Sequence, residues 1–212
     1  MKTTHVHVIV VVAAGLCAPL SSQDASNDWL LVPGERVGPI GPSTSEADLR
    51  RLFSPPNVRP TIVYLGEGEG RPGTIVFPTD STTCLTIVWR DTVARQHPEE
   101  IDLRGRRTRW HLANGVTLGF SLRDLERLNG RPFALSGWEH DAAGIVWGWS
   151  GGALETQMPI TGVRIYFAPP SADLLSREER SAVAGDRLLT SDLASLRRAN
   201  PGIAFIRLIL SR

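Results

Sequence analysis

Hydrophobic residues at helical spacing occur in two short segments of the chain, and the two segments are alike. Residues 48–54 read DLRRLFS, and residues 124–130 read DLERLNG, 76 positions later. The aspartate, both leucines and one arginine coincide between them. Because residues three positions apart lie on the same face of a helix, the pattern predicts one amphipathic helix at about residues 45–53 and another at about 121–129.

Both predicted helices begin with a capping signature. Ser43 stands three residues before Glu46 in the first segment, and Ser121 stands three residues before Asp124 in the second. In this arrangement the hydroxyl and the carboxylate can satisfy the first unpaired amides of a helix. Gly130 follows the second segment, where a glycine can form a left-handed cap at the helix end.

Strand-like runs follow each predicted helix. Residues 73–77 and 85–89 flank a polar turn after the first helix, and residues 144–149 and 163–167 come after the second. A short helix ahead of antiparallel strands, occurring twice, predicts an α+β fold. We expect two repeated units that form a sheet covered by helices. A chance match between the two segments is the alternative.

The remaining segments predict a hairpin and a C-terminal extension. Residues 101–112 are typical of a hairpin that turns near Gly105. Capping patterns predict short helices that start near Ser176 and over residues 191–198. Residues 203–210 predict a final strand, which we expect to return to the sheet.

The N-terminal stretch has the features of a secretory signal peptide. A charged residue is followed by an apolar run over residues 8–20 and then by small residues, and this run is too short to span a bilayer. Cleavage is expected after Ser22 or after Ala18. Because Leu16 rather than a small residue precedes Cys17, we expect no lipid anchor. The sequence therefore predicts an exported protein, periplasmic or extracellular.

These boundaries divide the chain into four parts. Residues 1–22 are the expected signal peptide, residues 23–112 the first α+β unit and residues 113–170 the second unit. Residues 171–212 are expected to form C-terminal helices and a strand that pack on the same domain. No membrane span is expected in the mature chain.

Composition and charge limit the classes of function. The 212 residues are 42% hydrophobic and 21% charged, with a formal net charge of +1, so we expect a globular protein without a nucleic-acid partner. Two cysteines exclude a disulfide-dense scaffold and a multi-cysteine metal site. Lys2 is the only lysine. The many arginines reflect either codon bias or the bidentate recognition of anions.

The second unit resembles a known fold family. The segment GVTLG at residues 115–119, the capped helix SLRDLERLNGRPF at residues 121–133 and the strands after it are similar to the β-lactamase-inhibitor-like unit. The small lipoprotein of the outer-membrane β-barrel assembly machine has this fold too, and uncharacterised exported bacterial proteins share the segment. The likeness is clearest over residues 113–150, whereas residues 53–56 (FSPP) depart from the Gly-x-Pro exit. The resemblance implies protein binding, as an inhibitor or scaffold, more than catalysis.

One catalytic pattern matches the sequence without its usual context. Residues 148–152 form a G-x-S-x-G motif, which in an α/β-hydrolase lies between a strand and a helix and needs a downstream histidine. Residues 153–159 do not predict a helix, and the last histidine, His140, is upstream. We interpret the motif as a strand end with a glycine turn, and we predict no catalytic residue.

One histidine and its neighbour form a weak metal candidate. His140 and Asp141 could both bind a metal ion, but the chain has no His-x-His or His-Glu-x-x-His pair. A solvated loop is the simpler interpretation, so we expect neither a metal nor another cofactor. If the protein is instead a small envelope hydrolase or a metal-assisted enzyme, then His140, Asp141 and His111 are its candidate residues.

Tryptophans and arginines are the candidates for a binding surface. The pattern of the first unit favours the core for Trp147, whereas Trp138 and Trp149 fit either the core or a partner-binding face. Arg107 and Arg109 alternate onto one strand face, where they could bind carboxylates or pair with nearby acids. We therefore predict a non-enzymatic module that binds another envelope or secreted protein through Trp138 and Trp149, with the two arginines at the rim.

Overall fold

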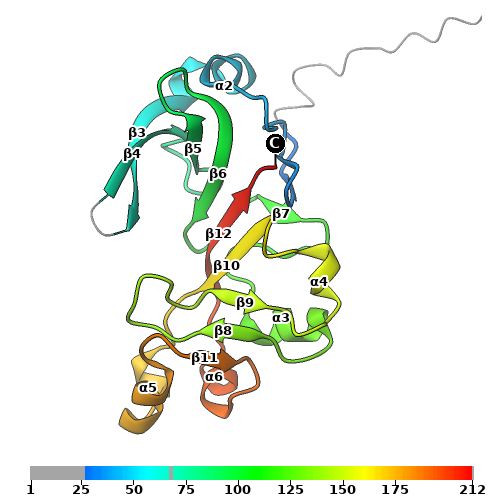
Figure 1. Ribbon diagram of the computed structural model, residues 1–212, viewed down its shortest axis with the longest axis vertical. Coiled ribbons are helices and arrows are strands. Elements are labelled where there is room, and N and C mark those ends of the chain that lie inside the picture. The colour runs from blue at the N-terminus through cyan, green and yellow to red at the C-terminus, as the bar shows by residue number, and fades with distance from the viewer. Residues whose placement is uncertain (1–26, 67–68, 212) are drawn as a thin grey trace, which may run out of the picture.

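Strands dominate this protein, and they form three sheets (Figure 1). The computed structural model describes residues 27–66 and 69–211, and the expected signal peptide lies outside the described residues. Within these ranges are five α-helices and twelve strands, so the fold is α+β, as the sequence predicts. None of these helices has both the length and the apolar character needed to cross a membrane.

The elements alternate between strands and short helices along the chain. The strands are β1 (Leu30–Val32), β2 (Arg36–Val37), β3 (Val58–Gly66), β4 (Glu69–Val76), β5 (Leu85–Asp91), β6 (Gln96–Arg104), β7 (His111–Leu112), β8 (Ala134–Ser136), β9 (Val146–Gly148), β10 (Val163–Phe167), β11 (Leu188–Thr190) and β12 (Ile203–Ile209). The helices are α2 (Glu46–Phe53), α3 (Leu122–Asn129), α4 (Leu154–Gln157), α5 (Arg177–Val183) and α6 (Ala194–Ala199).

The largest sheet has six antiparallel strands in the order β10-β12-β6-β5-β4-β3. Strands β6 and β12 are neighbours in its interior, where Arg104 pairs with Phe205 and Glu100 pairs with Ile209. Figure 1 shows the red β12 between the green β6 and the yellow β10. The final strand therefore returns to the sheet, as predicted.

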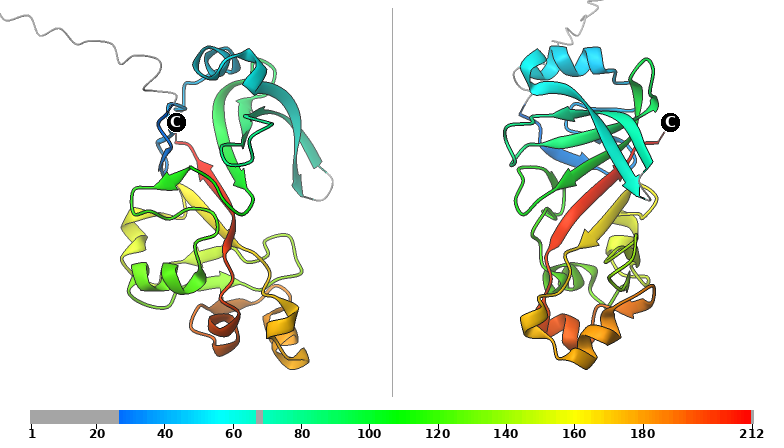
Figure 2. Two further views of the ribbon diagram at one scale, coloured as in Figure 1. Left: turned by 180° about the vertical axis from the view of Figure 1, so that it is seen from behind. Right: turned by 90° about the vertical axis from the view of Figure 1, so that its left-hand side faces the viewer.

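Two smaller sheets have the strand orders β2-β1-β7 and β11-β8-β9. An isolated bridge pairs Ile145, just before β9, with Tyr166 of β10. Beside it, the amide of Phe167 donates to the carbonyl of Gly144 at 2.9 Å. The β11-β8-β9 sheet thus continues from the outer edge of β10. Helices α5 and α6 lie with β11 at the end of the molecule opposite α2 (Figure 2).

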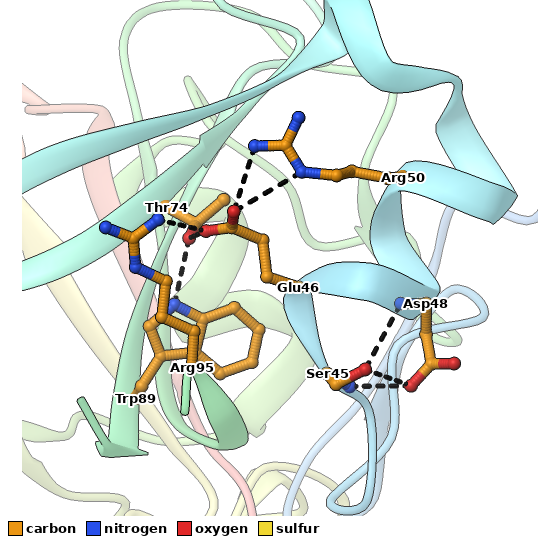
Figure 3. A network of polar contacts seen from close by, with 7 residues as sticks. All are labelled: Ser45, Glu46, Asp48, Arg50, Thr74, Trp89 and Arg95. Atoms are coloured by element: carbon orange, nitrogen blue, oxygen red, sulfur yellow. Dashed lines mark hydrogen bonds and ion pairs between the residues drawn. The ribbon is translucent and has the colours of Figure 1, made fainter. Parts of the chain in front are cut away.

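The two repeated segments form helices at the predicted places, and their caps explain where they begin. Helix α2 begins after Ser45, whose hydroxyl accepts a hydrogen bond from the amide of Asp48, while the Asp48 carboxylate accepts one from the Ser45 amide (Figure 3). The prediction that Ser43 is the cap is wrong by two residues. Helix α3 is capped by Ser121, as predicted, and ends at Gly130 with a left-handed φ of 75°.

Glu46, the first residue of α2, attaches this helix to the six-stranded sheet (Figure 3). Its carboxylate accepts hydrogen bonds from the hydroxyl of Thr74 on β4 at 2.6 Å and from the guanidinium groups of Arg50 and Arg95 at 2.9 Å each. Thr74 in turn accepts a hydrogen bond from the indole N–H of Trp89 on β5 at 2.9 Å. Burial alone would raise the pKa of Glu46, but these donors outweigh it and lower the pKa.

A single hydrophobic core lies between this sheet and the helices. Leu49 of α2 and Leu125 of α3 are fully buried, as their amphipathic pattern predicts. On neighbouring strands of the sheet, Ile87, Ile101 and Leu208 are paired side by side and have no exposed surface. Each such side chain contributes about 1.5–3 kcal/mol on burial. We call the sheet face that carries these three residues the inner face.

Residues 101–112 do not form the predicted hairpin. Strand β6 ends at Arg104, and after a loop His111 pairs in parallel with Leu30 of β1. Both edges of β6 are already occupied, by β5 and by β12, so a returning strand has no edge of β6 to pair with. The chain does turn after β6, where Gly105 has a φ of 128°, but the next strand belongs to another sheet.

The C-terminal elements agree with the sequence pattern. Helix α5 begins with a capping box between Ser176 and Glu179, and α6 spans the end of the segment predicted over residues 191–198. The left-handed residue Asn200 ends α6, and β12 follows at once. Helix α5, β11 and α6 thus form an insertion between β10 and β12.

We predict that Glu46→Ala lowers the free energy of unfolding by about 1–3 kcal/mol, because Thr74 and two arginines lose a shared acceptor in a half-buried site. Since the pKa of Glu46 is lowered in the folded state, its stabilising effect is present above the unfolded pKa and is lost as the pH falls through the folded pKa. Urea unfolding at neutral pH and in acid measures both effects. Glu178→Ala, an exposed change on α5, should leave stability within about 0.5 kcal/mol.

Candidate functional site

The face of the six-stranded sheet opposite the inner face is polar and aromatic. Side chains alternate along a strand, so the residues next to Ile87, Ile101 and Leu208 point the other way. Thr86 of β5 pairs with Asp102 of β6, and Asp102 pairs with Arg207 of β12. We call this face, marked by Thr86, Asp102 and Arg207, the outer face.

A buried ion pair lies at the centre of the outer face. The guanidinium of Arg207 donates from Nε to Oδ1 of Asp102 at 2.7 Å and from Nη2 to Oδ2 at 2.9 Å, and its Nη1 lies 3.0 Å from Oε2 of Glu100. Only 1% of the Asp102 side chain is exposed. Burial alone would lower the pKa of Arg207, but Asp102 and Glu100 outweigh it and raise the pKa.

Glu100 responds to the same burial in the opposite direction. Its desolvation raises the pKa, and the negative charge of Asp102 adds to this, whereas Arg207 and Arg164 act against it. The net result is a raised pKa. Glu100 is therefore protonated more easily in the folded protein than in the unfolded chain.

An aromatic stack continues the outer face toward β10. The guanidinium carbon of Arg104 lies 3.9 Å from the ring centroid of Phe205, and this ring stacks on Tyr166 with a centroid distance of 4.7 Å. The side chain of Arg104 is 62% exposed, and its ion pair with Asp102 is 3.6 Å long, beyond hydrogen-bond length. Arg104 is thus oriented by an aromatic ring while its charge stays open to solvent.

Two hollows lie side by side on this face, with volumes of about 310 and 320 Å³. Tyr64 of β3 and Arg104 line both of them. The first is also lined by Trp138, Asp141, Tyr166, Phe205 and Arg207, and the second by Thr61, Val63, Thr86 and Asp102. We call the two hollows together the trough. Tyr64 is 70% exposed, so an aromatic side chain stands in solvent at its middle.

Trp147 is exposed on β9, and its predicted place in the core is wrong. Ile145, just before β9, is bridged to Tyr166, but Trp147 lies at the register shift between β8 and β9 and has no partner on β8. Val146 packs into the core instead, whereas Trp147 is 51% exposed. The pattern misled because a register shift between β8 and β9 at Ala134 interrupts the alternation.

Trp138 and Trp149 are largely buried, with 5% and 1% of each residue exposed. The predicted place on a binding surface is wrong for Trp149, whereas Trp138 lines the first hollow of the trough. The indole N–H of Trp149 donates to the carbonyl of Met158 at 2.7 Å, and that of Trp138 donates to the carbonyl of Phe167 at 3.3 Å. Because the indole N–H groups of both rings donate to carbonyls within the fold, both side chains are buried without an unpaired polar atom.

The predicted rim arginines lie on a loop and not beside those tryptophans. Arg107 and Arg109 are both exposed between β6 and β7. The guanidinium carbon of Arg109 lies 5.7 Å from the ring centroid of Trp29. Neither is among the described residues that line the trough. Arg104, at the end of β6, lines the trough instead.

The predicted metal candidates do not come together. His140 lies in the loop between β8 and β9, where its Nε2 is 3.1 Å from the carbonyl oxygen of Gly137 and its Nδ1 accepts from the amide of Ala142 at 3.3 Å. His111 is on β7, in a different sheet. Among the residues that the structure describes, no three histidine, cysteine or acidic side chains are grouped to bind a metal ion.

The G-x-S-x-G segment forms a turn built around Asn129. The side-chain NH2 group of Asn129 donates to the carbonyl of Trp149 at 2.9 Å, and its side-chain oxygen accepts from the backbone amide of Leu154 at 3.2 Å. A Cβ atom at Gly152 would lie 2.1 Å from this oxygen, so packing alone explains the glycine. The expectation that no helix follows is wrong, since the four-residue α4 begins at Leu154. Ser150 itself is exposed, with a φ of 55°.

No family model matches this sequence, and neither a curated protein nor a solved structure is significantly similar to the chain. The resemblance to the β-lactamase-inhibitor-like unit therefore stays a prediction. The contacts described above are the basis for the function proposed below.

We predict that Asp102→Ala lowers the free energy of unfolding by about 3 kcal/mol, because it leaves the guanidinium of Arg207 buried without its two-bonded partner. Urea unfolding followed by circular dichroism measures the change. Asp186→Ala removes an exposed carboxylate and is the matched control. Equal stability of the two variants would show that the ion pair does not support the sheet.

We predict that Glu100→Gln changes the pH dependence of stability. Because the pKa of Glu100 is raised in the folded state, its favourable contribution is complete below the unfolded pKa and is lost as the pH rises through the folded pKa. The glutamine variant should therefore gain stability relative to the unmodified protein as the pH increases from about 4 to 7. Unfolding at a series of pH values tests this, with Glu35→Gln, an exposed position, as the control. If the free energies of unfolding of the two proteins differ by the same amount at every pH, the prediction is contradicted.

Proposed function

We propose that this protein is a non-enzymatic binding module, exported to the periplasm or the exterior, which binds another protein through its outer face. The observation that carries the proposal is the composition of that face. Trp147 on β9 and Tyr64 on β3 are largely exposed, and the exposed Arg104 lies over Phe205. Tryptophan, tyrosine and arginine are the residue types that contribute most to protein interfaces, because they bury a large area with few rotatable bonds.

The outer face is also rigid, which favours binding. Arg207 is held by two hydrogen bonds to Asp102, and both residues belong to strands in the middle of the sheet. Phe205 is fixed between Arg104 and Tyr166. Side chains that already have their bound conformation lose little entropy when a partner docks.

We also propose that the protein consists of two related units, as the sequence repeat predicts. Ser45 and Ser121, the caps of α2 and α3, each form an isolated antiparallel bridge, the first with Gln96 at the start of β6 and the second with Gly202 just before β12. The strands β3, β4, β5 and β6 lie in chain order on one side of the boundary between β6 and β12. Strands β8, β9, β10 and β12 lie in chain order on the other side of this boundary. Each unit is then one helix followed by four antiparallel strands.

The test of the binding function compares two exposed hydrophobic residues on different strands. Trp147 is 51% exposed on β9, and Leu188 is 70% exposed on β11. We predict that the purified protein captures one stoichiometric partner from envelope extract, identified by mass spectrometry. Trp147→Ala should weaken this capture at least tenfold, as expected for a central interface tryptophan, and Leu188→Ala should leave it unchanged. Both variants should keep the melting temperature, since neither side chain is in the core.

Four results would count against the binding module. Capture of no partner, or equal capture by Trp147→Ala, would show that the outer face is not the binding surface. A metal ion in the purified protein, or a hydrolytic activity that His140→Ala abolishes, would favour the alternative of a small envelope hydrolase or metal-assisted enzyme that uses His140, Asp141 and His111.

A further inference from the structure

The charges of the outer face are unequally distributed between its interior and its surface. The acids Glu100 and Asp102 are directed to Arg207, and this group is largely buried. Arg104 is 62% exposed and Arg164 is exposed beside Arg207. The positive groups therefore face solvent, whereas most of the negative charge is covered.

The excess of exposed positive charge continues toward β3. Arg59 of β3 pairs with Ile75 of β4, which pairs with Thr86, so Arg59 belongs to the outer face, and it is exposed. Asp141, at one end of the trough, is the exposed acid among the described residues that line it. A ligand of this face therefore meets more positive than negative charge.

The shape of the trough fits a chain more than a compact molecule. Its two hollows share Tyr64 and Arg104, so these two side chains lie at its middle and one hollow extends to each side. Each hollow, at about 310 or 320 Å³, is at the lower limit of small-ligand sites. One or two side chains of a peptide can fill such a volume on either side of a central residue.

The position of Arg104 defines what that central residue should be. The guanidinium carbon lies over the Phe205 ring, 3.9 Å from its centroid. The ion pair of Arg104 with Asp102 is 3.6 Å long, while both oxygens of Asp102 already accept from Arg207. Its N–H groups are thus available at a fixed orientation. A carboxylate is the group that such a planar cation binds best, with two parallel hydrogen bonds.

We propose that the trough binds an extended peptide segment of the partner protein, with a carboxylate of that segment on Arg104 and apolar side chains in the two hollows. This inference rests on the proposed function, because it specifies the chemistry of the partner at the same face. Tyr64, exposed above both hollows, packs against the bound segment.

The experiment uses two synthetic peptides that differ in one group. One is acetyl-Ser-Val-Glu-Val-Ser-amide, and the other has glutamine in place of the glutamate. Binding to the isotope-labelled protein is followed by chemical-shift changes. We predict that the glutamate peptide binds about tenfold more tightly than the glutamine peptide, since one charge-assisted pair is lost. The largest shifts should occur at Tyr64, Thr86, Arg104 and Phe205.

Arg104→Gln is the decisive variant, because the Arg104 side chain is 62% exposed. This variant should bind the two peptides with equal affinity. Arg51→Gln, which removes the same charge from the exposed surface of α2, should keep the difference. Arg104→Lys keeps the charge but not the planar group, and it should reduce the difference by several-fold. Circular dichroism shows that each variant is folded.

Each other result overturns the inference. Equal binding of both peptides, a difference that survives Arg104→Gln, shifts outside the trough, or no binding of either peptide at millimolar concentration would each show that the trough does not take an acidic segment. If the peptides fail while Trp147→Ala still abolishes capture of the partner, the binding function stands and only this inference is wrong.

Discussion

Strand β12 joins the two halves of this protein by pairing with β6 on one side and with β10 on the other. Its inner face adds Leu208 to the apolar layer formed by Ile101, and its outer face places Arg207 opposite Asp102. A shift of one residue in this register would move the guanidinium into the core and the leucine to the surface. The two faces therefore specify the same alignment by independent means.

The ion pair at the centre of the outer face has a second consequence. A buried salt bridge adds little net stability, because desolvation offsets its attraction, but it fixes the neighbouring groups. Asp102 uses both oxygens for Arg207, which leaves Arg104 to lie on Phe205 with its charge exposed. The charge that this face exposes to solvent is thus determined by a buried contact beneath it.

Local features of the fold could be predicted from the sequence, and long-range features could not. The two helices, the caps at Ser121 and Ser176 and the final strand depend on residues close in the chain, and they form where predicted. The surface could not be predicted, because burial of Trp149 and exposure of Trp147 depend on the register between β8 and β9. The sequence favours Arg107 and Arg109 over Arg104 for the surface, because only the pairing of β6 with β12 places Arg104 beside Phe205.

The central position of β12 also determines the order in which the chain can fold. Asp102 and Arg207 are separated by 105 residues, so one edge of β6 stays without its partner until the intervening helices and strands have been synthesised. Contacts of such long sequence separation form slowly, and an open strand edge invites pairing with other chains. A chain that leaves the ribosome in this order therefore lacks the last partner of β6 until late in synthesis.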